Sequence, residues 1–342
     1  MHNYGAGEGL GFFRASGIAF SHVETRDRLT EIRRPIDAGS RVTGPTVIRT
    51  NRREINLSSH THVIGVLNVT PDSFWDGGKF FDKQKAVDHA MSLVAAGADI
   101  VDVGGESTRP GAMAATESEE MHRVIPVIHA IRTQIETIIS VDTYKANVAR
   151  AAIAAGAEIV NDISGLAFDP MMRSVVSDAG VACVLTHNAS DREKMHALCE
   201  DTDIVAAVNS DLREKVELAV TSKIGWDKII IDPGIGFGKS TDDDLMLHSA
   251  LRRTNYYNLP MLVASSRKKF IGNVLGLAAP ERLAGTIASC IIALSHGATL
   301  LRVHDVKQVV EAARIFDAVT RRGMTETGIS HRPIAGAPRS DR

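Results

Sequence analysis

A short pattern recurs four times along this chain and constrains its fold more than any other feature. The copies are AAGADIVDVG at 95–104, AAGAEIVNDI at 154–163, DAGVACVLTH at 178–187 and SHGATLLRVH at 295–304. Each copy joins small helix-forming residues to a Gly suited to a helix C-terminus, and then to an apolar run that ends in polar residues. The pattern therefore predicts four joints at which a helix is followed by a buried strand.

Four further apolar runs bring the number of predicted strands to eight. They are VIGVLNV at 63–69, TIISVD at 137–142, KIIIDP at 228–233 and MLVASS at 261–266. Helical periodicity or helix-favouring composition occurs in the stretches between the strands, at 81–96, 116–134, 144–155, 203–224, 243–253, 280–296 and 306–320. Strands that alternate with helices predict a parallel sheet of the α/β class.

Polar residues at the strand ends favour a closed barrel over an open doubly wound sheet, although periodicity alone fits both. Side chains at or just past the predicted strand ends are Asn68, Asp102, Asp142, Asn161, Asp162, His187, Asp232, Ser266, Arg302 and His304. In a barrel they converge on one mouth, whereas an open sheet spreads them along an edge. We therefore predict a (β/α)8 TIM barrel and keep the open sheet as the alternative.

The barrel is expected to occupy residues 46–321 and to leave both ends of the chain outside it. Residues 1–45 contain Gly, Arg and Ser-rich stretches without sustained periodicity, and residues 322–342 are rich in Gly, Pro, Arg and Ser. Both segments are predicted to be disordered. The stretch TVIRTNRREINLSSH at 46–60 is predicted to form a hairpin before the first barrel strand.

Composition argues against several classes of partner. The net charge of −2 provides no overall field to attract nucleic acid or an acidic membrane. No apolar run approaches the roughly 18 residues that cross a bilayer, and the first residues lack the apolar core of a signal peptide. The cysteines, Cys183, Cys199 and Cys290, are odd in number and show no CxxC spacing. We therefore expect a cytoplasmic protein that binds neither nucleic acid nor membranes.

Two polar loops follow the first two predicted strands. LNVTPDSFWDGG at 67–78 has the composition of a flexible loop over a site, although Pro, Asp, Ser and Gly also make ordinary turns. GGESTRPGA at 104–112 offers Gly N–H groups and Arg109, which can bind a phosphate with two parallel hydrogen bonds. A salt-bridged surface loop is the alternative for an isolated Arg.

The other strand ends combine carboxylates with cations. Asp142, Asn161 and Asp232 would suit a flat heterocycle with several N–H donors, although each is also compatible with a helix N-cap. SSRKKFIG at 265–272 and RVHD at 302–305 add a cationic side suited to anionic groups. A solvated charge is the alternative for Lys269 in particular.

Nucleotide and zinc motifs are missing from the sequence. IDPGIGFGKS at 231–240 lacks the GxxxxGK[ST] spacing of a triphosphate-binding loop and does not match a dinucleotide fingerprint. His60 and His62 are two apart, and His187 and His304 are isolated, so no zinc spacing is present. Mg²⁺ held mostly by substrate phosphates needs only one or two protein oxygens and remains compatible with the sequence.

Taken together, the motifs closely resemble the dihydropteroate synthase family of pterin-binding TIM barrels. From about residue 54 to 306 they appear in family order as INLSSHTHVIGVLNVTPDSF, GADIVDVGGESTRPGA, ISVDTYKANVA, GAEIVNDISG, IIIDPGIGFGKS, SSRKKFIG and RVHDV. The resemblance implies a homodimeric transferase of folate biosynthesis that uses Mg²⁺ and is a sulfonamide target. It would condense 6-hydroxymethyl-7,8-dihydropterin diphosphate with 4-aminobenzoate to give 7,8-dihydropteroate, through dissociative loss of diphosphate.

The resemblance also implies a set of site residues. The positions that match the family's pterin pocket are Asp142, Asn161, Asp232, Lys268 and Arg302. Those that match its diphosphate site are Asn68, Thr108, Arg302 and His304, with Asn68 also the metal ligand. The aminobenzoate positions are Phe74, Arg109, Pro110, Phe237, Lys268 and Lys269. The residues expected to take part in catalysis are Asp76, Arg109, Asp142, Asp232 and Lys268.

Some positions depart from the family pattern. Thr186 replaces a common Met beside His187, Lys269 replaces a common Ser, and Trp75 with Lys79 makes the first loop bulkier and more basic. Two other functions are compatible with part of the pattern: a catalytically silent pterin-binding paralogue and a methyltetrahydrofolate-binding methyltransferase-type domain. The second needs no diphosphate loops, so ESTRPGA and TPDSF argue against it.

Overall fold

Eight parallel strands form the centre of the computed structural model, which describes residues 46–70, 83–107, 112–188 and 203–321. The strands are β3 (His62–Asn68), β4 (Ile100–Gly104), β5 (Ile138–Asp142), β6 (Ile159–Asp162), β7 (Ala182–Thr186), β8 (Ile229–Asp232), β9 (Leu262–Val263) and β10 (Leu300–Val303). They pair in the order β8-β7-β6-β5-β4-β3-β10-β9. Predictions for residues 1–45 and 322–342 lie outside the described residues.

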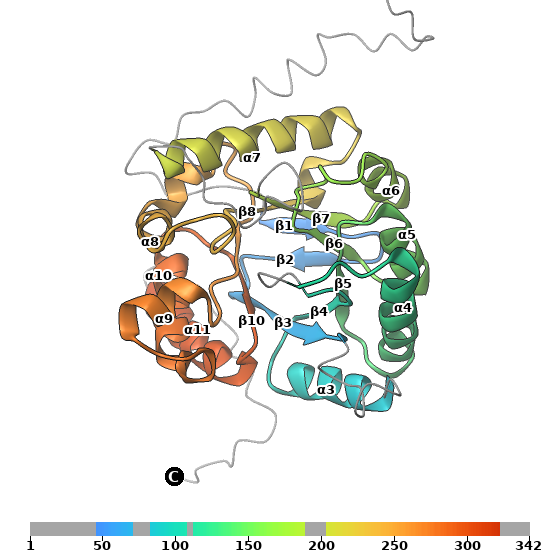
Figure 1. Ribbon diagram of the computed structural model, residues 1–342, viewed down its shortest axis with the longest axis horizontal. Helices are drawn as coiled ribbons and strands as arrows, with labels where there is room; N and C mark the ends of the chain where they lie inside the picture. Colours follow the sequence, from blue (N-terminus) through green and yellow to red (C-terminus); the bar gives the residue numbers. More distant parts are fainter. Residues whose placement is uncertain (1–45, 71–82, 108–111, 189–202, 322–342) are drawn as a thin grey trace, which may run out of the picture. The chain divides into compact units, whose positions relative to one another are not determined.

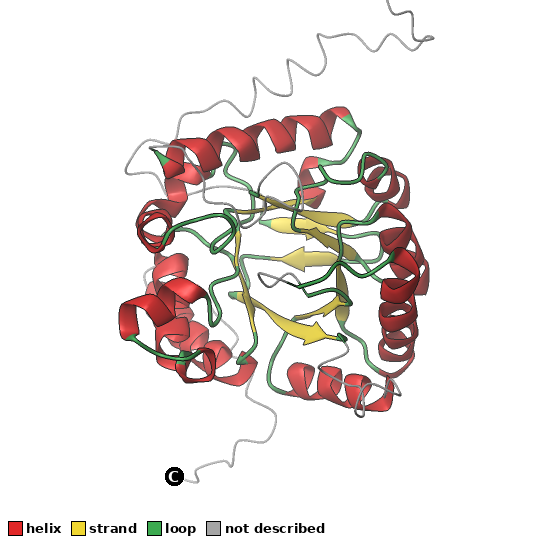
Figure 2. Ribbon diagram, in the orientation of Figure 1, coloured by secondary structure: helices red, strands yellow, loops and turns green. Residues whose placement is uncertain are grey.

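The two end strands of this sheet meet and close it. A parallel bridge joins Ile231 to Met261, and the N–H of Ile231 donates to the carbonyl of Pro260 at 2.9 Å. The sheet is therefore a nearly closed barrel, with the strands inside a ring of helices (Figures 1 and 2). This confirms the predicted TIM barrel, and the open doubly wound alternative is wrong.

Helices alternate with the barrel strands. Their bounds are α3 (Lys83–Ala95), α4 (Glu117–Gln134), α5 (Ala146–Ala155), α6 (Met172–Ala179), α7 (Ile204–Thr221), α8 (Thr241–Ala250), α9 (Lys269–Leu275), α10 (Leu283–Ser295) and α11 (Val306–Arg321). Short 3-10 turns are η1 (Trp226–Lys228), η2 (Leu251–Thr254) and η3 (Ala279–Glu281). Seven predicted helical stretches coincide with described helices. Of the other two, α6, with 8 residues, was predicted only by the helix end in the third copy of the recurring pattern, and α9, with 7 residues, was not predicted.

The Gly of the recurring sequence pattern follows a helix in each of its four copies. Gly97, Gly156, Gly180 and Gly297 have φ angles of 103°, 120°, 63° and 101°. Residues with a Cβ rarely adopt this region, whereas Gly enters it at little cost. A Gly in this conformation turns the chain from a helix into the following strand, which confirms the four predicted joints.

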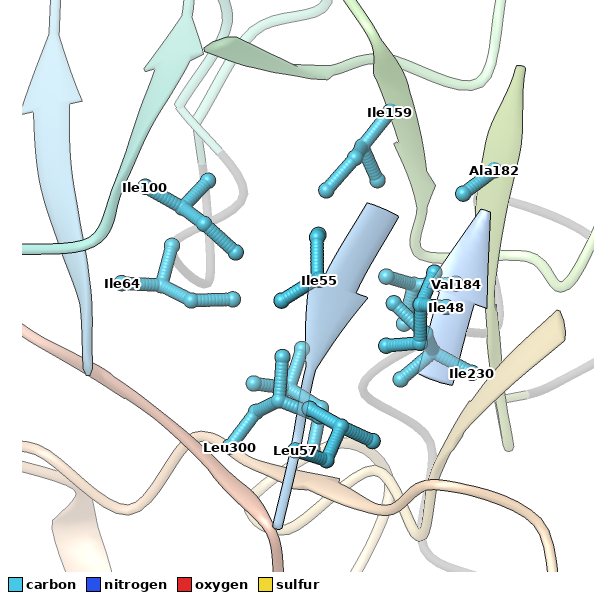
Figure 3. Close-up of a cluster of buried hydrophobic side chains, with 11 residues drawn as sticks. Ile48, Ile55, Leu57, Ile64, Ile100, Ile159, Ala182, Val184, Ile230 and Leu300 are labelled. Carbon is cyan, nitrogen blue, oxygen red and sulfur yellow. The ribbon is translucent and has the colours of Figure 1, made fainter. Parts of the chain in front are cut away.

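The predicted hairpin is present and closes the end of the barrel where the strands begin. It pairs β1 (Val47–Arg49) with β2 (Glu54–Asn56) in antiparallel register. Its buried side chains pack on the first residues of the barrel strands, as Figure 3 shows for Ile48, Ile55, Leu57, Ile64, Ile100, Ile159, Ala182, Val184, Ile230 and Leu300. Burial of one large aliphatic side chain stabilises a fold by about 1.5–3 kcal/mol, so the hairpin is part of the core.

Polar contacts reinforce this end of the barrel. The side chain of Glu158 is fully buried beneath the hairpin, accepts hydrogen bonds from Arg132 at 2.6 Å and Thr50 at 3.0 Å, and forms an ion pair with Arg53 at 3.0 Å. A buried carboxylate is tolerated only when paired in this way. The hairpin is therefore joined to the barrel by ionic as well as apolar contacts.

Two observations bear on the predicted cellular setting. Among the described residues, no helix combines the length and apolar character that a membrane span requires. Cys183 and Cys290 are buried free thiols, and burial raises the pKa of each to about 12. Cys199 lies outside the described residues. The two described thiols are thus protonated and sterically protected at neutral pH.

Candidate active site

One arginine bridges two aspartates at the end of the barrel where the strands stop. Arg302 of β10 donates from Nε to Asp102 Oδ2 at 2.6 Å and from Nη2 to Asp142 Oδ2 at 2.6 Å. Asn161 of β6 donates from Nδ2 to the same Asp102 oxygen at 3.0 Å. The barrel thus brings together side chains from β4, β5, β6 and β10, and fixes the guanidinium plane with charge-assisted bonds.

The charges in this cluster are strongly coupled. Burial raises the pKa of the Asp142 carboxyl, an effect that Asp102 reinforces and the Arg302 guanidinium opposes. For Arg302, burial lowers the pKa, but the Asp102 and Asp142 carboxylates outweigh it and place the net pKa above its ordinary value. Arg302 therefore stays cationic, and the mouth holds a fixed positive charge between two acids.

Asp232 and Lys268 are a second pair of oppositely charged residues whose pKa values affect each other. Asp232 ends β8, is buried, and accepts the Gly234 N–H at 2.7 Å through Oδ1. Burial raises its carboxyl pKa, whereas the Gly234 hydrogen bond and the Lys268 charge oppose that shift. Burial also lowers the pKa of the Lys268 ammonium, against the attraction of Asp232. The two groups thus carry perturbed protonation equilibria of the kind common at functional sites.

The loop after β8 is held by one lysine. Lys239 Nζ donates to the carbonyls of Gly234 and Phe237 at 2.9 Å each, and to His187 Nδ1 at 2.9 Å. Burial first, and the Lys239 charge second, lower the pKa of His187, so that its neutral ring accepts this bond. The Phe237 ring lies under Lys268, with Nζ 4.3 Å from the ring centroid, a cation–π distance.

Close packing explains one glycine of this loop. Gly234 has a φ of 68°, and a Cβ added there would lie 1.9 Å from the backbone oxygen of His187. Any other residue would force the loop away from β7. The Gly therefore allows the β8 loop to approach the next strand closely, and so sets the position of Phe237.

His304 and Ser266 form a neighbouring pair at the ends of β10 and β9. The Ser266 hydroxyl lies 3.1 Å from His304 Nδ1 and also accepts the His304 N–H at 3.2 Å. Burial of the ring lowers the pKa of His304 from its ordinary value, and the charges of Arg302 and Arg267 lower it further by smaller amounts. The imidazole is therefore neutral at neutral pH in the absence of an anion.

The predicted metal position has suitable chemistry. Asn68 ends β3 and lies opposite Gly104 in the register of β3 and β4. A Cβ added at Gly104 would lie 3.6 Å from Asp142 Oδ2 and 3.7 Å from Asn68 Oδ1, so both oxygens border the space that Gly104 leaves free. Amide and carboxylate oxygens are the donors that Mg²⁺ prefers. The residues present therefore fit a magnesium ion held mainly by substrate phosphates.

Most of the predicted site residues that the structure describes lie at strand ends or in the loops that follow. They are Asn68, Asp142, Asn161, Asp232, Phe237, Lys268, Arg302 and His304. Lys269 begins α9 and is exposed. The predictions for Phe74, Asp76, Thr108, Arg109 and Pro110 fall outside the described residues.

The sequence motifs predicted no site role for Asp102 or Lys239. In the structure, Asp102 binds Arg302 and Lys239 binds His187, so both residues lie within the site. Asp102 was placed at a strand end, whereas it lies two residues before the end of β4, fully buried inside the barrel. A single acid within the apolar run IVDVG was the available signal, because a buried carboxylate needs a partner.

The closed barrel and the charged cluster at the carboxyl ends of its strands define a TIM-barrel enzyme, because active sites of this fold lie at that face. Residues 64–304 match the family model described as pterin binding enzyme. Dihydropteroate synthase of Bacillus subtilis is 45% identical over 285 residues, which cover 83% of this chain and 96% of the relative. The chain therefore belongs to the dihydropteroate synthase family of transferases, as the sequence motifs indicated.

Solved structures of this family have the same fold. Dihydropteroate synthase of Xanthomonas albilineans with 4-aminobenzoic acid gives a TM-score of 0.75 at 40% identity, over 80% of this chain and 98% of that one. The enzyme from the same organism in complex with 7,8-dihydropteroate gives 0.72 at 38% identity, over the same shares of the two chains. These matches extend over nearly the whole of each relative.

Proposed function

We propose that this chain condenses 6-hydroxymethyl-7,8-dihydropterin diphosphate with 4-aminobenzoate to give 7,8-dihydropteroate and diphosphate. The observation that carries the proposal is Arg302, held at 2.6 Å by both Asp102 and Asp142 beside Asn161 in a barrel of this family. The related enzyme of Xanthomonas albilineans has been solved with 4-aminobenzoic acid and with 7,8-dihydropteroate, which supports the same substrates here.

In this proposal the pterin lies across the carboxyl ends of β5, β6 and β8. Asp142, Asn161 and Asp232 would accept its N–H groups, while Lys268 would donate to the ring carbonyl. Asp142 and Asp232 end β5 and β8, and Asn161 is the third of the four residues of β6. These strands pair with a neighbour on each side, β8 through the single bridge of Ile231 to Met261, so the orientation of the three acceptors is set before the substrate binds. Preformed acceptors of this kind favour a flat ring with donors at fixed spacing.

Chemistry would begin with loss of diphosphate. The C–O bond at the pterin methylene breaks, its electron pair leaves with diphosphate, and the dihydropterin ring delocalises the positive charge that remains. Asp142 and Asp232 stabilise this charge, while Arg302 and His304 bind the leaving anion. When bound at Asn68, Mg²⁺ supplies further positive charge against the diphosphate oxygens.

The second substrate would lie beside the β8 loop. Its ring would contact Phe237, and its carboxylate would face the ammonium of Lys268, with Lys269 adding charge nearby. The amine nitrogen attacks the methylene carbon and then loses a proton, and proximity provides most of the rate advantage. A sulfonamide of similar shape would compete for this pocket. Homodimer formation remains a prediction from the resemblance, and a cytoplasmic location remains a prediction from composition.

The test is a coupled measurement on purified protein with both substrates and Mg²⁺. We expect equal amounts of diphosphate and dihydropteroate, and a loss of at least 100-fold in kcat/KM for Arg302→Ala, or about 2.7 kcal/mol. Arg302→Lys keeps the charge but loses the two-pronged contact, and circular dichroism checks that both variants fold. Pterin binding without any product would favour the catalytically silent alternative.

A further inference from the structure

Three residues of metal-binding types meet at the opposite end of the barrel from the candidate active site. His62 begins β3, Asp99 directly precedes β4, and His60 precedes β3 after the hairpin. Donor atoms of His60, His62 and Asp99 all lie within 4.8 Å of one another. At about 3.3 Å per residue along β3, this cluster is about 20 Å from Asn68 at the other end of the strand. It is therefore separate from the predicted magnesium position.

His60 and Asp99 already face each other, and the ring of His62 lies against that of His60. His60 Nε2 lies 2.8 Å from Asp99 Oδ1, and the rings of His60 and His62 stack with centroids 4.2 Å apart and planes at 21°. The Ser59 hydroxyl lies 2.9 Å from His60 Nδ1. This contact on the far side of the ring directs Nε2 toward the carboxylate, as outer contacts of metal-binding imidazoles do.

The backbone around the cluster is held firmly. Asp99 Oδ2 accepts the Val63 N–H at 2.9 Å, which leaves Oδ1 facing His60. Thr61, between the two histidines, donates its N–H and its hydroxyl to Asp317 of α11 at 2.7 and 2.8 Å. The backbone that carries the three donor residues is therefore fixed by hydrogen bonds to Asp99 and Asp317.

We propose that His60, His62 and Asp99 bind a divalent transition-metal ion, with Zn²⁺ as its representative. Two imidazole nitrogens and one carboxylate oxygen form a donor set that zinc accepts, with a fourth position open to water. Zinc ligands at about 2.0–2.1 Å from the ion lie about 3.4 Å apart in tetrahedral geometry, so the widest pair must approach by about 1.4 Å. His60 is exposed and can supply this movement by side-chain rotation.

The ion would replace the proton shared between His60 and Asp99. It would thereby join the segment after the hairpin to the start of β4, and its effect would be on stability rather than on turnover. Mg²⁺ is a poor substitute, because it prefers oxygen donors and near-octahedral geometry. The proposal is independent of the proposed synthase activity.

Titration calorimetry on the full chain, freed of metal with a chelator, provides the test. We expect one Zn²⁺ per chain at this cluster, a higher melting temperature with Zn²⁺ than with equal Mg²⁺, and at least tenfold weaker zinc binding in His60→Ala. His122→Ala, an exposed histidine on α4, is the matched control and should bind zinc as the unchanged chain does. Synthase turnover with Mg²⁺ should be the same in all three proteins.

A second measurement distinguishes loss of the metal site from a defect in folding. Co²⁺ in a tetrahedral site absorbs visible light strongly, and this band should appear in the unchanged chain and be lost in both His60→Ala and Asp99→Asn. Zinc affinity and cobalt absorption that are unchanged in His60→Ala would overturn the proposal. Equal losses in His60→Ala and His122→Ala, or no zinc binding at millimolar concentration, would also overturn it.

Discussion

At the scale of single residues, Asp162 shows how burial can outweigh hydrogen bonds in shifting the pKa of a carboxyl group. Its carboxyl group ends β6 with no exposed surface, and Oδ1 accepts the Ser164 N–H at 2.7 Å and the Ser164 hydroxyl at 2.6 Å. Among the described residues, Oδ2 has no hydrogen-bond partner. Burial raises the pKa of this carboxyl to about 6, against the effect of the Ser164 bonds.

This shift predicts a dependence of stability on pH. Because the folded-state pKa lies above the unfolded value of about 3.9, the folded chain binds more protons, and the stabilisation present at low pH is lost as pH rises through about 6. Asp162→Asn does not titrate. The free energy of unfolding of Asp162→Asn minus that of the unchanged chain should therefore increase by about 2 kcal/mol as the pH is raised from about 4.5 to about 7.5.

Urea unfolding of both proteins at the two pH values measures this difference, because the other titrating groups cancel. Asp88→Asn, an exposed change on α3, controls for the loss of one charge. A difference between Asp162→Asn and the unchanged chain that stays constant with pH would show that Asp162 ionises normally.

Asp142, Asn161 and Asp232 were predictable from the sequence because each ends an apolar run, and strand ends meet at the mouth of a barrel. Asp102 was not assigned, because a shift of one residue in strand register reverses which side chains face inward. Its contact with Arg302 joins residues 200 positions apart. Sequence patterns can suggest that a buried acid needs a partner, but only the pairing of β3 with β4 and β10 identifies which one.

At the scale of elements, the β8 loop is organised by Lys239. Its ammonium group donates hydrogen bonds to three acceptors, which are His187 Nδ1 and the carbonyls of Gly234 and Phe237. Hydrogen bonds to a charged group contribute about 1.5–3 kcal/mol each, and acceptors left unpaired destabilise the loop further. Lys239 is therefore a positioning residue for Phe237, in the motif IDPGIGFGKS, whose spacing does not match a phosphate-binding loop.

We expect Lys239→Met to raise the KM for 4-aminobenzoate about tenfold, or about 1.4 kcal/mol, with a smaller change in the KM for the pterin substrate. The reason is that Phe237 moves while the pterin positions on β5 and β6 remain. Steady-state kinetics with each substrate varied in turn measures the split, and Lys307→Met on α11 is the exposed control. Equal increases in both KM values would mean that Lys239 acts only through overall folding.

Helix α9 was not predicted from the sequence, and of α6 only the C-terminal end was predicted. Each has about two turns, and a periodicity of 3.6 residues needs a window of about 11 residues to be recognised. In addition, α9 begins at Lys269, inside the motif SSRKKFIG that was predicted to lie at a cationic strand end. Tertiary contacts define it instead: Arg282 donates to the carbonyls of Arg267 and Lys268 at 3.1 and 3.3 Å, and so holds the residues that precede the helix.

At the scale of the whole molecule, the two ends of the barrel have separate tasks. The hairpin packs into the end where strands begin, and the polar cluster lies at the end where they stop. In TIM barrels the first end serves stability and the second serves chemistry. A change in the hairpin core should therefore affect stability while leaving the chemistry of the folded enzyme intact.

Ile55→Ala tests this division. Ile55 is 3% exposed at the centre of the hairpin cluster, so its truncation leaves a cavity and should lower the free energy of unfolding by about 2–4 kcal/mol. Ile315→Ala on α11, where the side chain is 69% exposed, should change it by less than about 0.5 kcal/mol. Below the unfolding transition, kcat/KM for both substrates should remain within about twofold of the unchanged chain. A drop of tenfold or more in folded Ile55→Ala would mean that packing at the hairpin is transmitted along the strands to Arg302 and Asp142, so that the barrel acts as one mechanical unit rather than as two independent ends.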